Sequence, residues 1–400
     1  MELRIRSREL HALEHEREHD RVRMGGTAAM TDWWKKRTVR DVYRFVRVSR
    51  ATGEELEMLP MLRGGSITRN NDVRILDTAE VTRVGKFDIG ADLVRVYRTA
   101  EWSGGHSETI VLGTFIPVIP SRNVHNRFST ATVKLYGRLQ ELLQDKFAHP
   151  YTVNKGDNAV EVAKKVAADI GLTVIADPSD YTVSRTRVYG IGADQNNSET
   201  DDTKLGMVND LLSLAGFRAA KDDVMGNILY SKYVDPVNRP ASYSMSEGPD
   251  CKFEPDMTDE QDITEIANHA VVIYMGEDKD GNQTTYVGEA WDNDPDSQFS
   301  TISRGYTITK SYEYSDAPVG STAEEKQAYA DKRAETLLKT NQSAIRRVTM
   351  TSAGYPATVN DSLDIDYPSG SISGKFEIRV QKLTLTGGCP TETELRQFVR

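Results

Sequence analysis

Short runs of β-branched and aromatic residues dominate the chain from residue 39 to residue 150. In one run Ala131, Val133 and Leu135 alternate with Thr, Lys and Tyr, the period of two that is typical of a half-buried strand. The pattern predicts a β-barrel or sandwich of about 100 residues, followed by a short helix over 137–147. The other runs are Val42–Val48, Leu93–Tyr97 and Ile110–Ile119, and turn-forming residues separate the runs at Gly64-Gly65, Asn70-Asn71-Asp72 and Gly104-Gly105.

The spacing of apolar residues changes to a helical period after residue 150. One helix begins after Asn158, which is the cap residue. Glu161 lies at capping-box spacing from it, and the helix ends at Gly171. A second helix, ending at Gly216, has an apolar stripe of its own. Strands are predicted at 181–188, 217–220 and 228–233, so this part is a compact α+β region. The two stripes are Ala159, Val162, Ala163, Val166 and Ile170, and Val208, Leu211, Leu212 and Ala215.

The last part of the chain returns to β structure. Runs at 270–275 and 284–290 flank an Asp-Gly turn and predict a hairpin. A helix over 322–338 opens with a Thr322/Glu325 capping box. Within the strand that starts near Phe376 the apolar phase flips at Gln381-Lys382, which predicts a β-bulge.

Charge and cysteine content narrow the functional classes. The 50 Lys and Arg against 60 Asp and Glu give a net charge of −10, which argues against a general nucleic-acid binder. Residues 1–40 carry ten basic and seven acidic side chains (+3), whereas residues 190–300 carry seven basic and twenty-three acidic ones (−16). Two cysteines and the lack of an apolar signal at the start indicate a protein made in the cytosol.

The first 36 residues predict a charged helical arm with too few apolar residues for a core. We expect it to contact a partner, although synthesis could also start at Met30. His11, His15 and His19 would share one helix face, a spacing that could chelate a metal, but a solvated helix explains them better.

Other candidate motifs are incomplete. Asp278, Asp280, Asn282 and Glu289 have calcium-loop spacing, yet Gln283 replaces the required glycine and the flanks are strands. Tyr189-Gly-Ile-Gly192 lacks the third glycine of a dinucleotide loop. The sequence therefore predicts no catalytic, cofactor-binding or metal-binding residue, no cofactor, and no enzyme activity. A two-carboxylate cell-wall hydrolase remains an alternative, because such sites have no fixed local spacing.

The segment that begins at Tyr151 resembles a different module. Tyr151-Thr-Val-Asn-Lys-Gly-Asp157 and the helix carrying Val162-Ala-Lys-Lys165 resemble the first half of a LysM peptidoglycan-binding repeat. A LysM repeat would continue with a second helix, whereas this sequence predicts strands. A peptidoglycan-binding tail component that acts through this segment is the main alternative function.

The order of elements and several short motifs resemble the phage tail hub family, which includes baseplate hubs and the base of type VI secretion spike proteins. The likeness covers about residues 37–395. Its clearest motifs are Leu112-Gly-Thr-Phe-Ile-Pro117, Leu135-Tyr-Gly-Arg-Leu-Gln-Glu-Leu142, Met207–Phe217 followed by Asp223–Ile228, the stretch 262–272 with Asn268, and Thr358–Ile365 with Ser373–Ile378, where Asn360 replaces the usual glycine.

This resemblance implies an α+β, mainly β fold with two β-barrel tube domains, two small α/β domains inserted between them, and an N-terminal helical arm. It divides the chain into an arm (1–36), a first tube-like domain (37–150), small domains at 151–195 and 196–269, and a second tube-like domain with an embedded helix (270–400). No enzymatic or receptor-binding extension is expected after Arg400.

The same resemblance implies a structural function. A homotrimer would form a ring at the virion tail tip that continues the hexameric tail tube and leaves a channel for the tape-measure protein and DNA. The implied partners are a distal tail or tail tube protein, the tape-measure protein, and further tail-tip or fibre proteins, with no sequence-specific nucleic-acid binding. Assembly would take place in the host cytoplasm.

Overall fold

The computed structural model describes most of the chain after residue 39. The described ranges are 40–85, 89–118, 123–125, 128–190, 202–234, 238–260, 266–277, 283–314, 318 and 322–398. The predicted arm (1–36), its three histidines and the predicted boundary at 195/196 lie outside the described residues.

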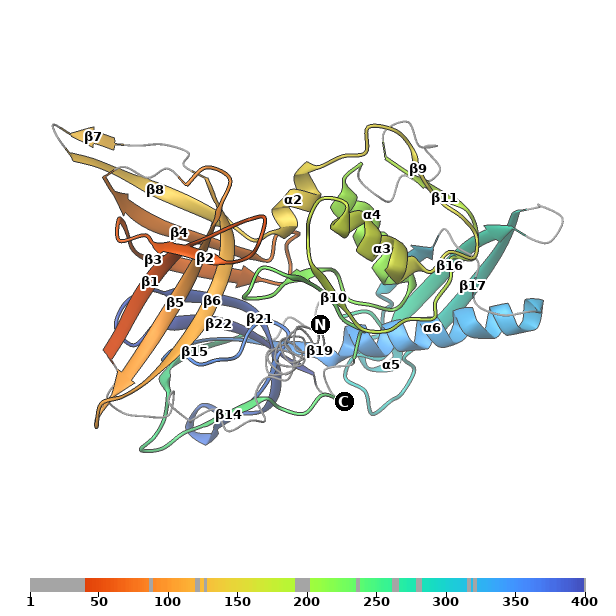
Figure 1. Ribbon diagram of the computed structural model, residues 1–400. Coiled ribbons are helices and arrows are strands. Elements are labelled where there is room, and N and C mark those ends of the chain that lie inside the picture. Colours follow the sequence, from red (N-terminus) through yellow and green to blue (C-terminus); the bar gives the residue numbers. More distant parts are fainter. Residues whose placement is uncertain are drawn as a thin grey trace, which may run out of the picture.

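The largest element is a 14-stranded sheet that takes strands from both ends of the chain (Figure 1). The strand over Asp77–Val84 alternates buried and more exposed residues along its whole length, as a strand with one face on a core does. The amino-terminal strands are β1 (Arg40–Val48), β2 (Glu55–Met58), β3 (Leu62–Asn70), β4 (Asp77–Val84), β5 (Leu93–Trp102), β6 (His106–Val118), β7 (Asn123–His125) and β8 (Phe128–Tyr136). The carboxyl-terminal strands are β14 (Tyr243–Ser246), β15 (Phe253–Glu260), β19 (Ala344–Ser352), β20 (Ser362–Tyr367), β21 (Ile372–Thr384) and β22 (Thr391–Phe398).

The two predicted β regions are joined edge to edge. Strand β21 pairs antiparallel with β3, from Val380 opposite Asn70 to Thr384 opposite Ser66. The strand order is therefore β15-β19-β22-β21-β3-β4-β8-β6-β5-β1-β2. The mainly β architecture agrees with the sequence-based expectation. The predicted barrels are not confirmed: no closed barrel forms among the described strands, since the strand path ends in β15 and β2, which do not pair with each other.

Between the β regions lies one α/β unit with a single hydrophobic core. Helices α3 and α4 pack against each other, and β10 pairs in parallel with β13 from Val174 opposite Ile228. The core contains residues from Leu139 to Tyr230 together with Leu76 of the first β region, so both predicted small domains contribute to it. The elements are α2 (Leu139–Gln144), β9 (Tyr151–Val153), α3 (Ala159–Ala168), β10 (Val174–Ala176), β11 (Arg187–Tyr189), α4 (Lys204–Leu214), β12 (Lys221–Asp222) and β13 (Ile228–Tyr230).

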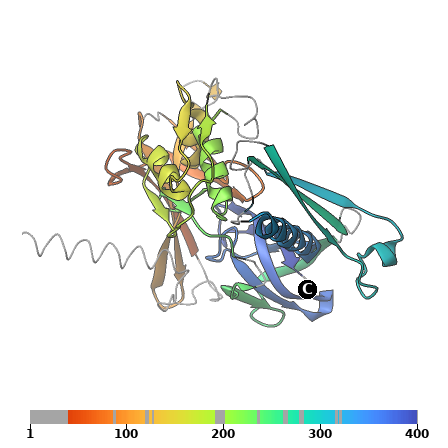
Figure 2. The same cartoon turned by 90° about the vertical axis from the view of Figure 1, so that its right-hand side faces the viewer.

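A third layer consists of a long helix on a small sheet (Figure 1). Helix α6 (Ala323–Ser343) packs against β16 (His269–Glu277) and β17 (Gln283–Trp291), and β18 (Thr309–Tyr314) completes the sheet. A Cβ at Gly288 would collide with the backbone of Ala330, so only glycine allows this close approach. Figure 2 shows the β16–β17 hairpin projecting on the side away from the α/β unit. The short helices α5 (Thr301–Arg304) and η4 (Pro368–Gly370) complete the fold.

Several local predictions are confirmed. Oδ1 of Asn158 accepts hydrogen bonds from the backbone N–H groups of Val160 and Glu161, at 3.0 and 3.1 Å. The Thr322/Glu325 capping box forms at the start of α6. Strands β16 and β17 pair directly from His269–Trp291 to Glu277–Gln283, as a hairpin requires.

Other predictions need correction. Gly64-Gly65 is a bulge inside β3 rather than a turn, since the register shifts between Arg63 and Ser66. The bulge in β21 lies between Ile378 and Val380, slightly before the predicted site. The strand predicted over 181–188 is shorter in the structure. Only β11 pairs with β9, and Thr182 forms a single bridge to Asn158. The strand predicted over 217–220 is reduced to a bridge at Phe217.

Candidate channel face

One face of the 14-stranded sheet is polar across the seam between the β regions. On the opposite face Ile67, Val81, Val133 and Leu383 are buried and belong to one core. Because side chains alternate along a strand, the residues between them point the other way. A row on this polar face, here called the channel face, runs from β19 to β8 through positions paired in register. The row is Thr351, Glu392, Lys382, Thr68, Thr78 and Tyr136.

A second row on the channel face has the same character. Thr384 lies opposite Ser66, Ser66 opposite Glu80, and Glu80 opposite Lys134. Thr82 and Thr132 form a neighbouring pair. Hydroxyl groups on β-branched side chains suit both a strand and a hydrated surface. The channel face is therefore a polar sheet face that suits contact with water, and it does not cover a hydrophobic core.

Acidic and basic side chains are interspersed on the channel face. Arg347 lies 3.1 Å from Glu394 and 3.8 Å from Glu260, measured between nitrogen and oxygen atoms. Lys134 lies 3.8 Å from Glu80, and Lys382 is paired in register with Glu392. These pairs are half-exposed, so each contributes little stability. At these positions of the channel face each basic side chain therefore has an acidic neighbour.

A stronger pair lies on the opposite face at this end of the sheet, on the side of the buried Val348. Arg346 on β19 donates two hydrogen bonds to the Asp259 carboxylate on β15, at 2.7 and 2.6 Å. This bidentate contact lowers the pKa of Asp259. It ties β15, the last strand on this path of the sheet, to its neighbour.

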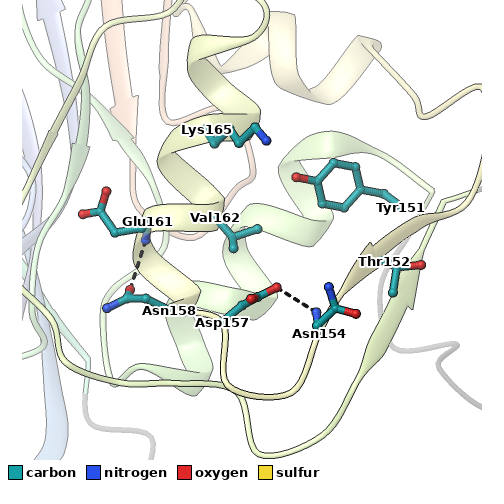
Figure 3. Close-up of a pocket in the computed structure, with 8 residues that line it drawn as sticks. All are labelled: Tyr151, Thr152, Asn154, Asp157, Asn158, Glu161, Val162 and Lys165. Atoms are coloured by element: carbon teal, nitrogen blue, oxygen red, sulfur yellow. Dashed lines mark hydrogen bonds between the residues drawn. The ribbon is translucent and has the colours of Figure 1, made fainter.

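A polar groove of about 400 Å³ lies on the LysM-like segment (Figure 3). The Tyr151 ring forms one wall and Lys165 on α3 lies opposite it. Two of its polar groups are already engaged, since Oδ2 of Asp157 accepts the Asn154 N–H at 2.8 Å and Asn158 caps α3. The lining residues are Tyr151, Thr152, Asn154, Asp157, Asn158, Glu161, Val162 and Lys165.

The groove matches only half of a LysM repeat. Strand β9 and helix α3 occupy the expected places, and β9 pairs antiparallel with β11. Between α3 and β11 the structure has β10 and no second helix, and all of these residues are described. Cell-wall binding by this segment stays a prediction.

The candidate metal-binding positions from the sequence can be compared with the described part of the chain. Within it, no group of three or more His, Cys, Asp and Glu side chains is placed to hold a metal ion. Three of the four calcium-loop positions, 278, 280 and 282, lie outside the described residues, and the fourth, Glu289, is on β17. None of the described helices is both long and apolar enough to cross a membrane.

The channel face was partly visible in the sequence. The alternation of Ala131, Val133 and Leu135 with Thr132 and Lys134 predicted a two-faced strand. What the sequence did not reveal was that polar faces from strands about 300 residues apart form one surface, because pairing between distant strands leaves no local signal.

In this fold two β regions share one sheet, and the α/β unit lies between them along the chain. Two solved structures of similar fold are described as tail proteins. The chain is 13% identical to the tail protein from Neisseria meningitidis MC58, with 89% of this chain and 96% of that chain covered and a TM-score of 0.60. It is 12% identical to the 43 kDa tail protein of prophage MuSo2 from Shewanella oneidensis, with 90% and 98% covered and a TM-score of 0.58.

These comparisons confirm the resemblance at the level of the fold: the chain has the fold of phage tail proteins. No protein-family model matches the sequence, and no curated protein matches it.

Proposed function

We propose that the protein is a structural component of a phage tail tip, in which three copies form a ring around a channel. The channel face lines the passage for the tape-measure protein and for DNA. Its paired charges and hydroxyl groups keep the passage hydrated without holding a polyanion. The protein has no enzyme activity in this proposal.

The ring explains why one chain carries two β regions. A hexameric tail tube presents six equivalent surfaces, which a homotrimer can match only with two similar units per chain. Residues 37–150 and 270–400 act as these tube-like units, and the units close into a barrel-like wall only when the ring is complete. The α/β unit lies at the periphery, whereas β14 and β15 of the predicted 196–269 domain belong to the main sheet and so to the wall. The arm (1–36) contacts a neighbouring subunit.

The partners follow from this position. A tail tube or distal tail protein stacks on one side of the ring, and further tail-tip or fibre proteins attach on the other. The tape-measure protein passes through it, and DNA is not bound by sequence. The protein acts at the virion tail tip after assembly in the host cytoplasm.

The observation that carries the proposal is the seam between β21 and β3. It makes the two β regions neighbours in one sheet within a single chain, as adjacent units of a ring wall must be. The core beside the seam includes Ile67 and Leu383 from the two sides, so the junction is packed as well as hydrogen-bonded.

Mass photometry of the full chain tests the proposal. We expect a species of three times 44.7 kDa, and a ring with a central passage in electron micrographs. A permanent assembly of this kind needs interfaces above about 2,000 Å². A protein that stays monomeric over the whole accessible concentration range, alone and with its tail partners, would contradict the ring.

A further inference from the structure

A cluster of arginines lies where the α/β unit and the segment after it meet β21. Glu377 on β21 is 4% exposed and accepts a hydrogen bond from Arg239 at 2.6 Å. Arg218 and Arg379 each place a guanidinium nitrogen 3.7 Å from an oxygen of the same carboxylate. Three guanidinium groups therefore surround one buried acid.

A fourth arginine extends the cluster along the sheet. Arg396 on β22 is paired in register with Glu377, and its guanidinium lies 3.1 Å from the carboxylate of Asp72, between β3 and β4. Arg379 also pairs with Asp72. The next acid, Glu394, is 3.8 Å from Arg396 and is engaged more closely by another arginine at 3.1 Å. Four arginines thus face two carboxylates, a surplus of two positive charges.

The charged residues that border the cluster do not cancel this surplus, because they are matched among themselves. Lys375 donates a hydrogen bond to the backbone carbonyl oxygen of Arg239 at 2.8 Å and lies opposite Asp364 on β20. Lys221 interacts with Asp361. The surplus therefore stays with the four arginines.

Most of the donors in the cluster have no acceptor among the described residues. Each guanidinium carries five N–H donors, whereas the four side chains together donate five hydrogen bonds to described residues. The Nε atoms of Arg239 and Arg379 are buried without a hydrogen-bond partner. The four side chains are only 16–30% exposed, so water reaches them in part. Burial and then the charge of Arg239 lower the pKa of Arg218, since both disfavour a further cation there.

We propose that the four arginines bind one small dianionic oxyanion, of the class of inorganic phosphate or sulfate. Planar guanidinium groups donate paired N–H groups to the oxygens of such an anion. One dianion balances the surplus of two charges and supplies acceptors to donors that lack them. DNA carries one charge per phosphate, so two successive phosphates would have to reach side chains that are mostly covered.

The bound anion connects three parts of the chain. Arg218 belongs to the α/β unit, Arg239 to the segment that follows it, and Arg379 and Arg396 to the main sheet. The anion therefore stabilises the contact between the unit and the sheet. It also neutralises positive charge beside the channel face, where Arg396 is paired in register with Arg347. The binding site does not depend on the ring.

Isothermal titration calorimetry of the full chain with inorganic phosphate tests the site, in phosphate-free buffer at constant ionic strength and a pH at which phosphate is largely a dianion. We expect saturable binding of one phosphate per chain. Arg218→Gln should bind phosphate about tenfold more weakly, because a charged donor is lost. Arg40→Gln is the matched control: Arg40 is 79% exposed on β1, and its replacement should leave the affinity unchanged.

A second variant covers the case in which Arg218→Gln does not fold. Arg396 is the most exposed of the four side chains, so Arg396→Gln should keep the circular dichroism spectrum of the wild type and still weaken phosphate binding. Absence of saturable binding to the wild type would overturn the proposal, as would equal affinities of the wild type and both variants. A short single-stranded DNA should not displace the phosphate. Displacement by DNA would instead assign the cluster to a polyanion.

Discussion

At the scale of single residues, buried polar side chains form hydrogen bonds that fix how neighbouring segments lie against each other. Gln381 is 1% exposed, and its amide donates to the Tyr355 hydroxyl at 3.1 Å and to the Ala357 carbonyl oxygen at 3.2 Å. Burial raises the pKa of Tyr355 to about 12. The phase flip at Gln381 indicated a bulge that lies slightly earlier, between Ile378 and Val380. The hydrogen-bond partners of Gln381 could not be predicted because they lie on other segments.

The Arg98–Asp41 pair gives a prediction at this scale. The Arg98 Nε lies 2.7 Å from Oδ1 of Asp41, and the other Asp41 oxygen accepts the Gly388 N–H at 2.7 Å. The pair thus connects the first β region to the end of the second. Arg98→Met leaves a buried carboxylate without its cation and should lower the free energy of unfolding by about 3–5 kcal/mol.

Urea unfolding measures this loss, and Arg347→Met is the matched control. Arg347 is 48% exposed and pairs with carboxylates on the open channel face, so its removal should cost no more than about 1 kcal/mol. Equal losses in the two variants would show that burial does not set the strength of the Arg98 pair.

At the scale of elements, the sequence predicted what depends on neighbours along the chain. The caps of α3 and α6, the β16–β17 hairpin and most strands were found because periodicity and capping residues are local signals. The seam of β21 with β3 and the parallel pairing of β10 with β13 were not found, since they join residues far apart. Gly64-Gly65 was misread because a glycine pair suits a bulge as well as a turn.

The shared core of the α/β unit leads to a prediction for one element. Val166 on α3 is 1% exposed in the core that also contains Leu211 and Tyr230. Val166→Asp places an unpaired charge there and should unfold the whole unit while the main sheet persists. Hydrogen exchange should then rise together in α3, α4 and β13.

The neighbouring exposed position provides the control for this experiment. Lys165→Asp introduces the same side chain outside the core and should leave exchange in α4 and β13 unchanged. If Val166→Asp raised exchange in α3 alone, the described residues of the unit would behave as two independent domains.

At the scale of the whole molecule, the proposed ring depends on which surface of the chain would remain open after assembly. The polar residues of the channel face are spread over β19, β22, β21, β3, β4 and β8, and only the seam makes them one surface. A surface that lines a passage stays hydrated, whereas a surface between subunits becomes dehydrated. Substitutions that are tolerated in water and costly in an interface distinguish the two cases.

The last prediction uses this difference. Changing Thr68, Thr78 and Thr132 together to Lys adds positive charge to the channel face, and the same three changes to Gln serve as a size-matched neutral control. If the face lines the passage, both variants should still form the trimer, because the added side chains remain in water. The lysine variant should also bind a labelled DNA fragment that the wild type and the glutamine variant do not bind, with an affinity that falls steeply as salt rises. Mass photometry and fluorescence anisotropy measure the two effects. Loss of the trimer in the lysine variant alone would instead place the channel face between subunits, since an unpaired buried charge costs far more than a buried amide.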